Sequence, residues 1–149
     1  MLASGTNDLR PTENPDVNSL INLQINKIDQ IRKINPRGTI IIMPVLPTRD
    51  PEMNTNIMMF NRSMRAWLCE KSQDENLVMP TLMEFVDRDG LLRNGLLRNS
   101  GDLIHIGPNG VSRYVRIVKG VIYAKQQELR AQYVYPKKSK AGFHPRKPA

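Results

Sequence analysis

Residues 39–45 read TIIIMPV, and this short stretch decides the fold class of the chain. A strand with one exposed face alternates between apolar and polar residues, whereas this run is apolar at every position from Ile40 to Val45. Continuous apolar runs rich in β-branched residues are typical of strands covered on both faces, as in a parallel sheet. We therefore expect a buried parallel strand here.

A helix is predicted directly upstream, over residues 17–34. Asp16 is well suited to begin it, because an aspartate carboxylate accepts hydrogen bonds from the free N–H groups of a first helical turn. The sequence NPRG at 35–38 ends the helix and turns the chain toward the strand. Apolar residues recur at helical spacing and form one stripe, namely Val17, Leu20, Ile21, Ile28 and Ile31.

Downstream of the strand, the loop LPTRDPE at 46–52 leads into a second amphipathic helix at about 53–73. A further strand-like segment covers 76–86, and Pro80 interrupts it. Residues 87–107 have the composition of an irregular loop, and a final helix follows at about 108–131, with Pro108 in its first turn. The second helix is expected to turn five residues inward: Ile57, Phe60, Met64, Trp67 and Leu68.

This alternation of strands and helices predicts an α/β fold with a parallel sheet and right-handed crossovers. In such sheets, functional groups gather where the strands end, at their carboxyl edge. Three polar segments fall at predicted strand ends or just before the last helix: SGTNDL at 4–9, LPTRD at 46–50 and GDLIH at 101–105. We therefore expect these three segments to converge.

The composition limits the class of protein and its compartment. A chain of 149 residues with 40% hydrophobic and 24% charged residues can bury a core, and no apolar run is long enough to cross a bilayer. No signal peptide is apparent, and the single cysteine, Cys69, can form neither an internal disulfide nor a structural zinc site. We expect a cytoplasmic or nuclear protein without membrane contact, metal or cofactor.

The formal net charge of +8 is concentrated at the C-terminal end. The last 13 residues, 137–149, contain five basic side chains and no acidic one, and residues 132–149 are predicted to be a disordered basic tail. Such a tail can hold a polyanion loosely by releasing counterions, so weak RNA or DNA contact is a candidate role. The five basic residues are Lys137, Lys138, Lys140, Arg146 and Lys147.

Asp102 and His105 are the sharpest candidates for chemistry. An aspartate three positions before a histidine can hydrogen-bond the ring Nδ1, which fixes the tautomer and leaves Nε2 free to act as a base. The same spacing also occurs when either residue merely caps a helix. Gly5, Asn7 and Asp8 likewise suit an ordinary turn as well as an active-site turn.

Taken together and in this order, these motifs resemble the SGNH, or GDSL-type, hydrolase family. Its Gly-x-Asn-Asp block is matched by residues 5–8, its Asp-x-x-His block by residues 102–105, and IGPNGV at 106–111 is similar to the usual continuation. The resemblance covers residues 1–131. It implies a flavodoxin-like three-layer α/β/α fold and hydrolysis of a small ester or acylated substrate by a Ser-His-Asp triad.

Within this resemblance, His105 is the base, Asp102 orients it, and Asn7 supplies a side-chain amide to the oxyanion hole. Gly5 and Asp8 shape the turn beside the site. The family's Gly-Asp-Ser block, which carries the nucleophile, does not occur in residues 1–149, so the domain is expected to be N-terminally truncated and inactive as it stands. Ser4, Ser100 and Cys69 are poor substitutes because of their predicted positions.

Two other functions fit the same sequence. In one, the chain is a non-catalytic SGNH-like binding module, in which the tail contacts nucleic acid and the Asp-His pair is residual. In the other, it is a fragment of a mobile-element protein without independent activity.

Overall fold

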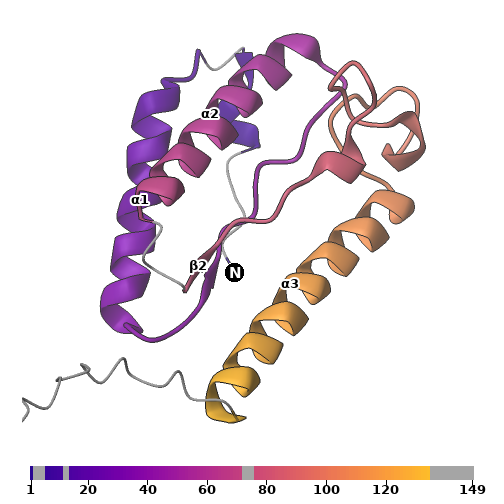
Figure 1. Ribbon diagram of the computed structural model, residues 1–149. Helices are drawn as coiled ribbons and strands as arrows, with labels where there is room; N and C mark the ends of the chain where they lie inside the picture. The colour runs from indigo at the N-terminus through magenta and orange to yellow at the C-terminus, as the bar shows by residue number, and fades with distance from the viewer. Residues whose placement is uncertain (2–5, 12–13, 72–75, 135–149) are drawn as a thin grey trace, which may run out of the picture. The chain divides into compact units, whose positions relative to one another are not determined.

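The computed structural model describes residues 1, 6–11, 14–71 and 76–134 as a mixed α/β structure. The chain divides into two compact units, Met1–Tyr114 and Val115–Ala149. Within the described residues, the three α-helices are α1 (Val17–Ile34), α2 (Pro51–Glu70) and α3 (Pro108–Val134), and the two strands are β1 (Ile40–Ile41) and β2 (Leu77–Val78). Figure 1 shows α1 and α2 side by side.

Helix α1 begins and ends at the predicted residues. Asp16 caps it: its carboxylate accepts hydrogen bonds from the backbone N–H of Ser19 at 3.2 Å and from the Ser19 hydroxyl at 2.7 Å. These hydrogen bonds, led by that from the hydroxyl, hold the pKa of Asp16 below its ordinary value. The predicted stripe is wrong at Ile31, which is 37% exposed; the last residue that α1 contributes to the core is Ile28.

Strands β1 and β2 pair in parallel, as predicted, but over a shorter length than 39–45 and 76–86. Ile40 pairs with Leu77 and Ile41 with Val78, and the last ladder hydrogen bond joins the Ile42 N–H to the Val78 carbonyl at 2.8 Å. Prolines follow in both segments, at positions 44 and 80, and a proline has no N–H to donate. The run from Ile40 to Val45 is nevertheless buried at every position, which confirms the predicted burial.

Helix α2 starts two residues before the predicted position and stops three residues short of the predicted end. Asp50 caps it by accepting hydrogen bonds from the backbone N–H groups of Glu52 and Met53 at 3.0 and 3.2 Å. Its buried face meets α1 and β1 in one hydrophobic core. The α2 residues in that core are Met53, Ile57, Phe60 and Met64, with Trp67 and Leu68 partly buried against it.

Side chains of α2 hold the backbone where the two strands no longer pair. The Asn61 amide bonds Val45 twice, accepting from its N–H and donating to its carbonyl, both at 2.8 Å. Asn54 accepts from the Thr48 N–H at 2.7 Å, and Arg65 donates to the carbonyls of Met79 and Pro80 at 3.1 and 2.9 Å. Three polar residues on one helix thus replace the missing strand-to-strand hydrogen bonds.

Residues 87–107 are irregular, as predicted, but the strand predicted to continue to residue 86 ends at Val78, and the segment between β2 and α3 is ordered by two short 3₁₀ turns and two isolated bridges. The turns are η3 (Met83–Phe85) and η4 (Asn94–Leu96), and the bridges pair Val86 with Leu92 and Leu97 with Ile106. Helix α3 starts at Pro108, as predicted, and continues to Val134. The predicted boundary at 131/132 therefore falls inside a helix, because Pro136 is the first helix-breaking residue after Gly120.

The Asn61 contacts give a test of this arrangement. We expect Asn61→Ala to lower the free energy of unfolding by about 2–5 kcal/mol, because both backbone groups of Val45, which is 4% exposed, lose their partner. The matched control is Asn22→Ala, since Asn22 is exposed on α1 and its substitution should change stability by less than about 0.5 kcal/mol. Urea denaturation of both variants measures the difference, and equal midpoints would contradict the assigned role.

Candidate functional site

Asp102 and His105 form a hydrogen-bonded pair in the segment that precedes α3. The His105 Nδ1 lies 2.9 Å from Asp102 Oδ2 and 3.1 Å from Oδ1. The Asp102 side chain is 13% exposed and that of His105 is 54% exposed, so the carboxylate is the inner member of the pair. The spacing of three residues does bring the two side chains together, as the sequence predicted.

Backbone groups hold the Asp102 carboxylate in place. Its Oδ1 accepts hydrogen bonds from the N–H groups of Ile104 at 3.0 Å and His105 at 2.9 Å. The backbone hydrogen bond from His105, followed by that from Ile104, lowers the pKa of Asp102 to about 2, while burial acts in the opposite direction. The guanidinium of Arg98 lies 2.8 Å from Oδ2 and adds a positive charge on the outer side.

This geometry determines which nitrogen of His105 is available. The ionised Asp102 carboxylate can only accept hydrogen bonds, so in the neutral ring Nδ1 carries the proton and Nε2 carries the lone pair. Among the described residues, none forms a hydrogen bond with Nε2. The pair therefore presents an oriented, solvent-accessible imidazole that can accept a proton from a hydroxyl group placed next to it.

Arg49 anchors the segment that carries the pair. Its backbone N–H donates to the Leu103 carbonyl at 2.7 Å, and its Nη1 reaches Asp87 Oδ2 at 3.1 Å and the Leu92 carbonyl at 2.7 Å. Burial raises the pKa of Asp87, but hydrogen bonds from Arg49 and from the Leu91 and Asp89 N–H groups outweigh it and hold the value below its ordinary range. The predicted convergence of LPTRD with GDLIH is thus confirmed, and Arg49 is a residue that the sequence analysis missed.

Two glycines allow the pair to sit directly before α3. A Cβ on Gly107 would lie 2.7 Å from the Leu97 carbonyl oxygen, and one on Gly110 would lie 2.8 Å from the Leu96 carbonyl oxygen. Both separations are too short for a side chain, so the IGPNG sequence lets the helix start pass close to η4. The Gly107 N–H completes this contact by donating to Leu96 at 2.8 Å.

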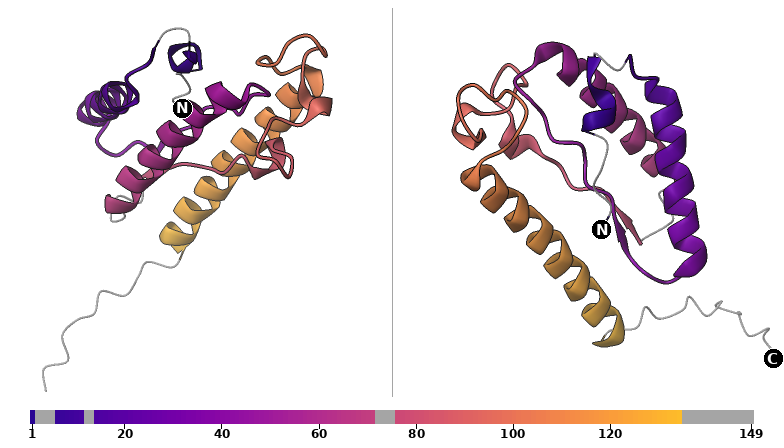
Figure 2. Two further views of the ribbon diagram at one scale, coloured as in Figure 1. Left: turned by 90° about the horizontal axis from the view of Figure 1, so that it is seen from above. Right: turned by 180° about the vertical axis from the view of Figure 1, so that it is seen from behind.

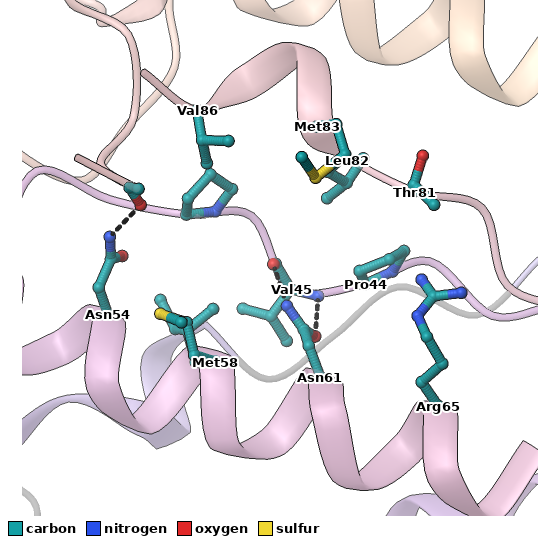
Figure 3. A pocket seen from close by; sticks show the side chains of 13 residues that line it. Pro44, Val45, Asn54, Met58, Asn61, Arg65, Thr81, Leu82, Met83 and Val86 are labelled. Atoms are coloured by element: carbon teal, nitrogen blue, oxygen red, sulfur yellow. Dashed lines mark hydrogen bonds between the residues drawn. The ribbon is translucent and has the colours of Figure 1, made fainter. Parts of the chain in front are cut away.

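An apolar pocket of about 310 Å³ opens where the two strand segments separate over α2 (Figure 3). Polar side chains in its wall, Asn54, Asn61 and Arg65, already bond the backbone, so they leave little hydrogen-bonding capacity for a ligand. The pocket suits an apolar group of small-ligand size. Its apolar walls include Val45, Ile57, Met58, Leu82, Met83 and Val86.

A second, more polar hollow of about 410 Å³ borders the Asp102–His105 segment. Arg49 and Leu103 line it, together with Asn94, Asn99 and Ser100. Ser100 is exposed and two residues before Asp102, but no hydrogen bond joins it to His105 in the described part of the chain. The hollow therefore offers amide and guanidinium groups for a polar ligand. Among the described residues that line it, none is a nucleophile hydrogen-bonded to His105.

Asp8, a further predicted site residue whose side chain is described, does not join the Asp102–His105 pair. Asp8 lies in a short 3₁₀ turn, η1 (Asn7–Leu9), and is exposed beside a small hollow whose other residues come from η1, α1 and α2. Gly5 and the side chain of Asn7 lie outside the described residues, as do the tail cations Lys137, Lys138, Lys140, Arg146 and Lys147. Cys69 is exposed on α2.

The described residues contain neither a candidate metal centre nor a candidate membrane span. No group of three or more His, Cys, Asp or Glu side chains within them is arranged to hold a metal ion. In the same part of the chain, no helix combines the length and the apolar character that a membrane span needs.

The depressed pKa of Asp102 predicts a pH effect on stability. Its folded pKa of about 2 lies below the ordinary value of 3.8, so its ionised form stabilises the fold above about pH 4, and this contribution disappears as the pH falls toward 2. Unfolding free energies measured at several pH values should therefore decline less steeply in Asp102→Asn than in the unchanged chain between pH 4 and pH 2. Parallel pH profiles for the two proteins would refute the proposed hydrogen-bond cluster.

Comparison with known proteins adds no relative to this description. No family model matches the chain, and no curated protein or solved structure resembles it closely enough to count as a match. The geometry of the Asp102–His105 pair therefore carries the functional argument by itself.

Proposed function

We propose that this chain is the C-terminal part of an SGNH-type hydrolase domain, in which His105 is the general base for ester hydrolysis. The observation that carries the proposal is the contact of 2.9 Å between His105 Nδ1 and Asp102 Oδ2, with Nε2 left accessible. A carboxylate fixed by two backbone N–H groups orients the ring without needing to move during the reaction.

The proposed reaction needs a serine hydroxyl from outside residues 1–149, because no Gly-Asp-Ser block occurs within them. His105 Nε2 accepts the hydroxyl proton as the serine oxygen attacks the ester carbonyl, and then gives that proton to the departing alcohol. Asp102 remains ionised throughout and stabilises the imidazolium. His105 Nε2 then accepts a proton from a water molecule as that water attacks the acyl-serine, and returns the proton to the serine oxygen as the carboxylic acid leaves. Asn7 is the proposed side-chain donor to the oxyanion, with Gly5 and Asp8 shaping its turn.

The fold proposed for the complete domain is a flavodoxin-like three-layer α/β/α sandwich. The parallel pairing of β1 with β2 through the crossover helix α2 supports it, since this is the repeating unit of such sheets. The buried run from Ile40 to Val45 is also what a central strand requires. A small ester or acylated compound is the proposed substrate, and the cytosol or nucleus the proposed location.

A chimaera tests the hydrolase proposal. The N-terminal part of an active SGNH esterase, including its Gly-Asp-Ser block, is joined ahead of residue 1 of this chain. We expect hydrolysis of p-nitrophenyl acetate and labelling of the introduced serine by a fluorophosphonate. Replacing His105 by alanine should lower kcat by roughly 10³-fold or more, because the serine then lacks a base.

The chain provides a matched control for this experiment. His144 is the only other histidine, so His144→Ala in the same chimaera should leave turnover unchanged. A folded chimaera with equal activity in the unchanged and His105→Ala forms would remove His105 from the mechanism. A folded chimaera without turnover or fluorophosphonate labelling would favour a non-catalytic binding role instead.

The chain by itself should behave differently. Residues 1–149 are expected to hydrolyse p-nitrophenyl acetate no faster than an equal concentration of free imidazole, because the described base has no engaged nucleophile. Turnover that disappears in His105→Ala would contradict this expectation and would show that a residue within the chain serves as nucleophile.

A further inference from the structure

The charge of this chain divides sharply at the start of α3. Residues 1–107 contain 12 basic and 13 acidic side chains, and are close to neutral. Residues 108–149 contain ten basic side chains and one acidic side chain. Five of these ten, Arg113, Arg116, Lys119, Lys125 and Arg130, lie within α3 itself. The excess positive charge is therefore carried by an ordered helix as well as by the tail.

The helix concentrates its exposed cations on one face. At 100° per residue, Arg116, Lys119, Tyr123 and Arg130 fall within a sector of about 60°. All four residues are exposed, and Tyr123 is 64% exposed. With a rise of 1.5 Å per residue, the row from Arg116 to Arg130 is about 21 Å long. We call these four residues the basic face of α3.

The single acidic residue of α3 is kept away from this face. Glu128 lies on the far side of the helix, about 150° from the centre of the basic face. Its carboxylate is bonded to the ammonium of Lys125 at 2.9 Å, so its charge is locally compensated. The residues that flank the basic face instead include the exposed amides of Gln126 and Gln127. The face is thus positive along its whole length without an internal counter-charge.

We propose that the basic face of α3 binds single-stranded nucleic acid. Arg116, Lys119 and Arg130 would contact backbone phosphates, and Tyr123 would stack on an unpaired base. Proteins that bind single strands without sequence preference combine a positively charged surface along the phosphate backbone with aromatic rings on which bases stack, and the basic face of α3 presents both kinds of group. The proposal concerns the helix and is independent of the proposed hydrolase function.

The position of Tyr123 favours single-stranded nucleic acid over a duplex or an anionic membrane surface. The bases of a duplex are already stacked on each other, so a duplex gains nothing from the exposed ring. Helices that lie on a membrane surface carry their aromatic residues on the apolar face, whereas Tyr123 lies among the cations. The exposed apolar residues Val115, Ile122 and Leu129 occupy a neighbouring sector instead.

Fluorescence anisotropy with the full chain and a labelled 20-nucleotide oligouridylate tests the proposal at several KCl concentrations. Each phosphate contact to a single strand contributes about 0.7 to the slope of log K against log salt concentration. We therefore expect Arg116→Gln, Lys119→Gln and Arg130→Gln together to reduce the slope by about 2 and to weaken binding. The control replaces Lys33, Arg37 and Lys71, which are exposed outside α3, by glutamine and should keep the original slope.

Tyr123→Ala provides an independent readout, because it leaves the charge unchanged. We expect at least about a fivefold loss of oligouridylate affinity, retention in Tyr123→Phe, and no effect on a 20-base-pair duplex. The proposal is overturned if the triple helix variant binds the oligouridylate like its control, or if Tyr123→Ala has no effect. Charge-dependent binding to anionic phosphatidylserine vesicles without binding to the oligouridylate would also overturn it and identify a membrane surface as the partner.

Discussion

The arrangement of the site depends on a few side-chain amides of α2 that hold backbone where strand pairing has ended. The ladder between β1 and β2 stops at Ile42, and the buried chain beyond it still contains polar groups that need partners. Asn61 pairs with Val45 and Asn54 with Thr48, so the chain stays extended and leaves the core in a fixed direction. Arg49 follows immediately and carries the connection to the catalytic candidates.

Much of the fold could be predicted because its signals are local. Asp16 marks a helix start through its capping carboxylate and Pro108 through its fixed backbone angle, and the run from Ile40 to Val45 is buried because its residues are apolar. The shortness of β1 and the roles of Asn61 depended on partners far away in the sequence. An asparagine on the apolar side of a predicted helix was the available signal, since a buried amide must find hydrogen bonds.

The candidate site likewise combines contacts that are local in the sequence with contacts between distant residues. The contact between Asp102 and His105 spans three residues, and the spacing indicated it, although the same spacing also suits a helix cap. The interaction of Arg49 with Leu92 spans 43 residues, and no local pattern indicates it. The basic face of α3 was not predicted for another reason: the net charge of +8 was assigned mainly to the tail, although α3 itself contains five basic residues and one acidic residue.

These different sequence separations have a consequence for how the protein folds. Contacts within residues 98–105 close short loops at little entropic cost, so the Asp102–His105 pair can form before the long-range contacts of the fold are made. The side-chain contacts of Arg49 form only when residues 38 and 43 positions apart meet. We therefore expect the candidate-site segment to acquire its internal geometry before the contacts of Arg49 fix its position in the fold.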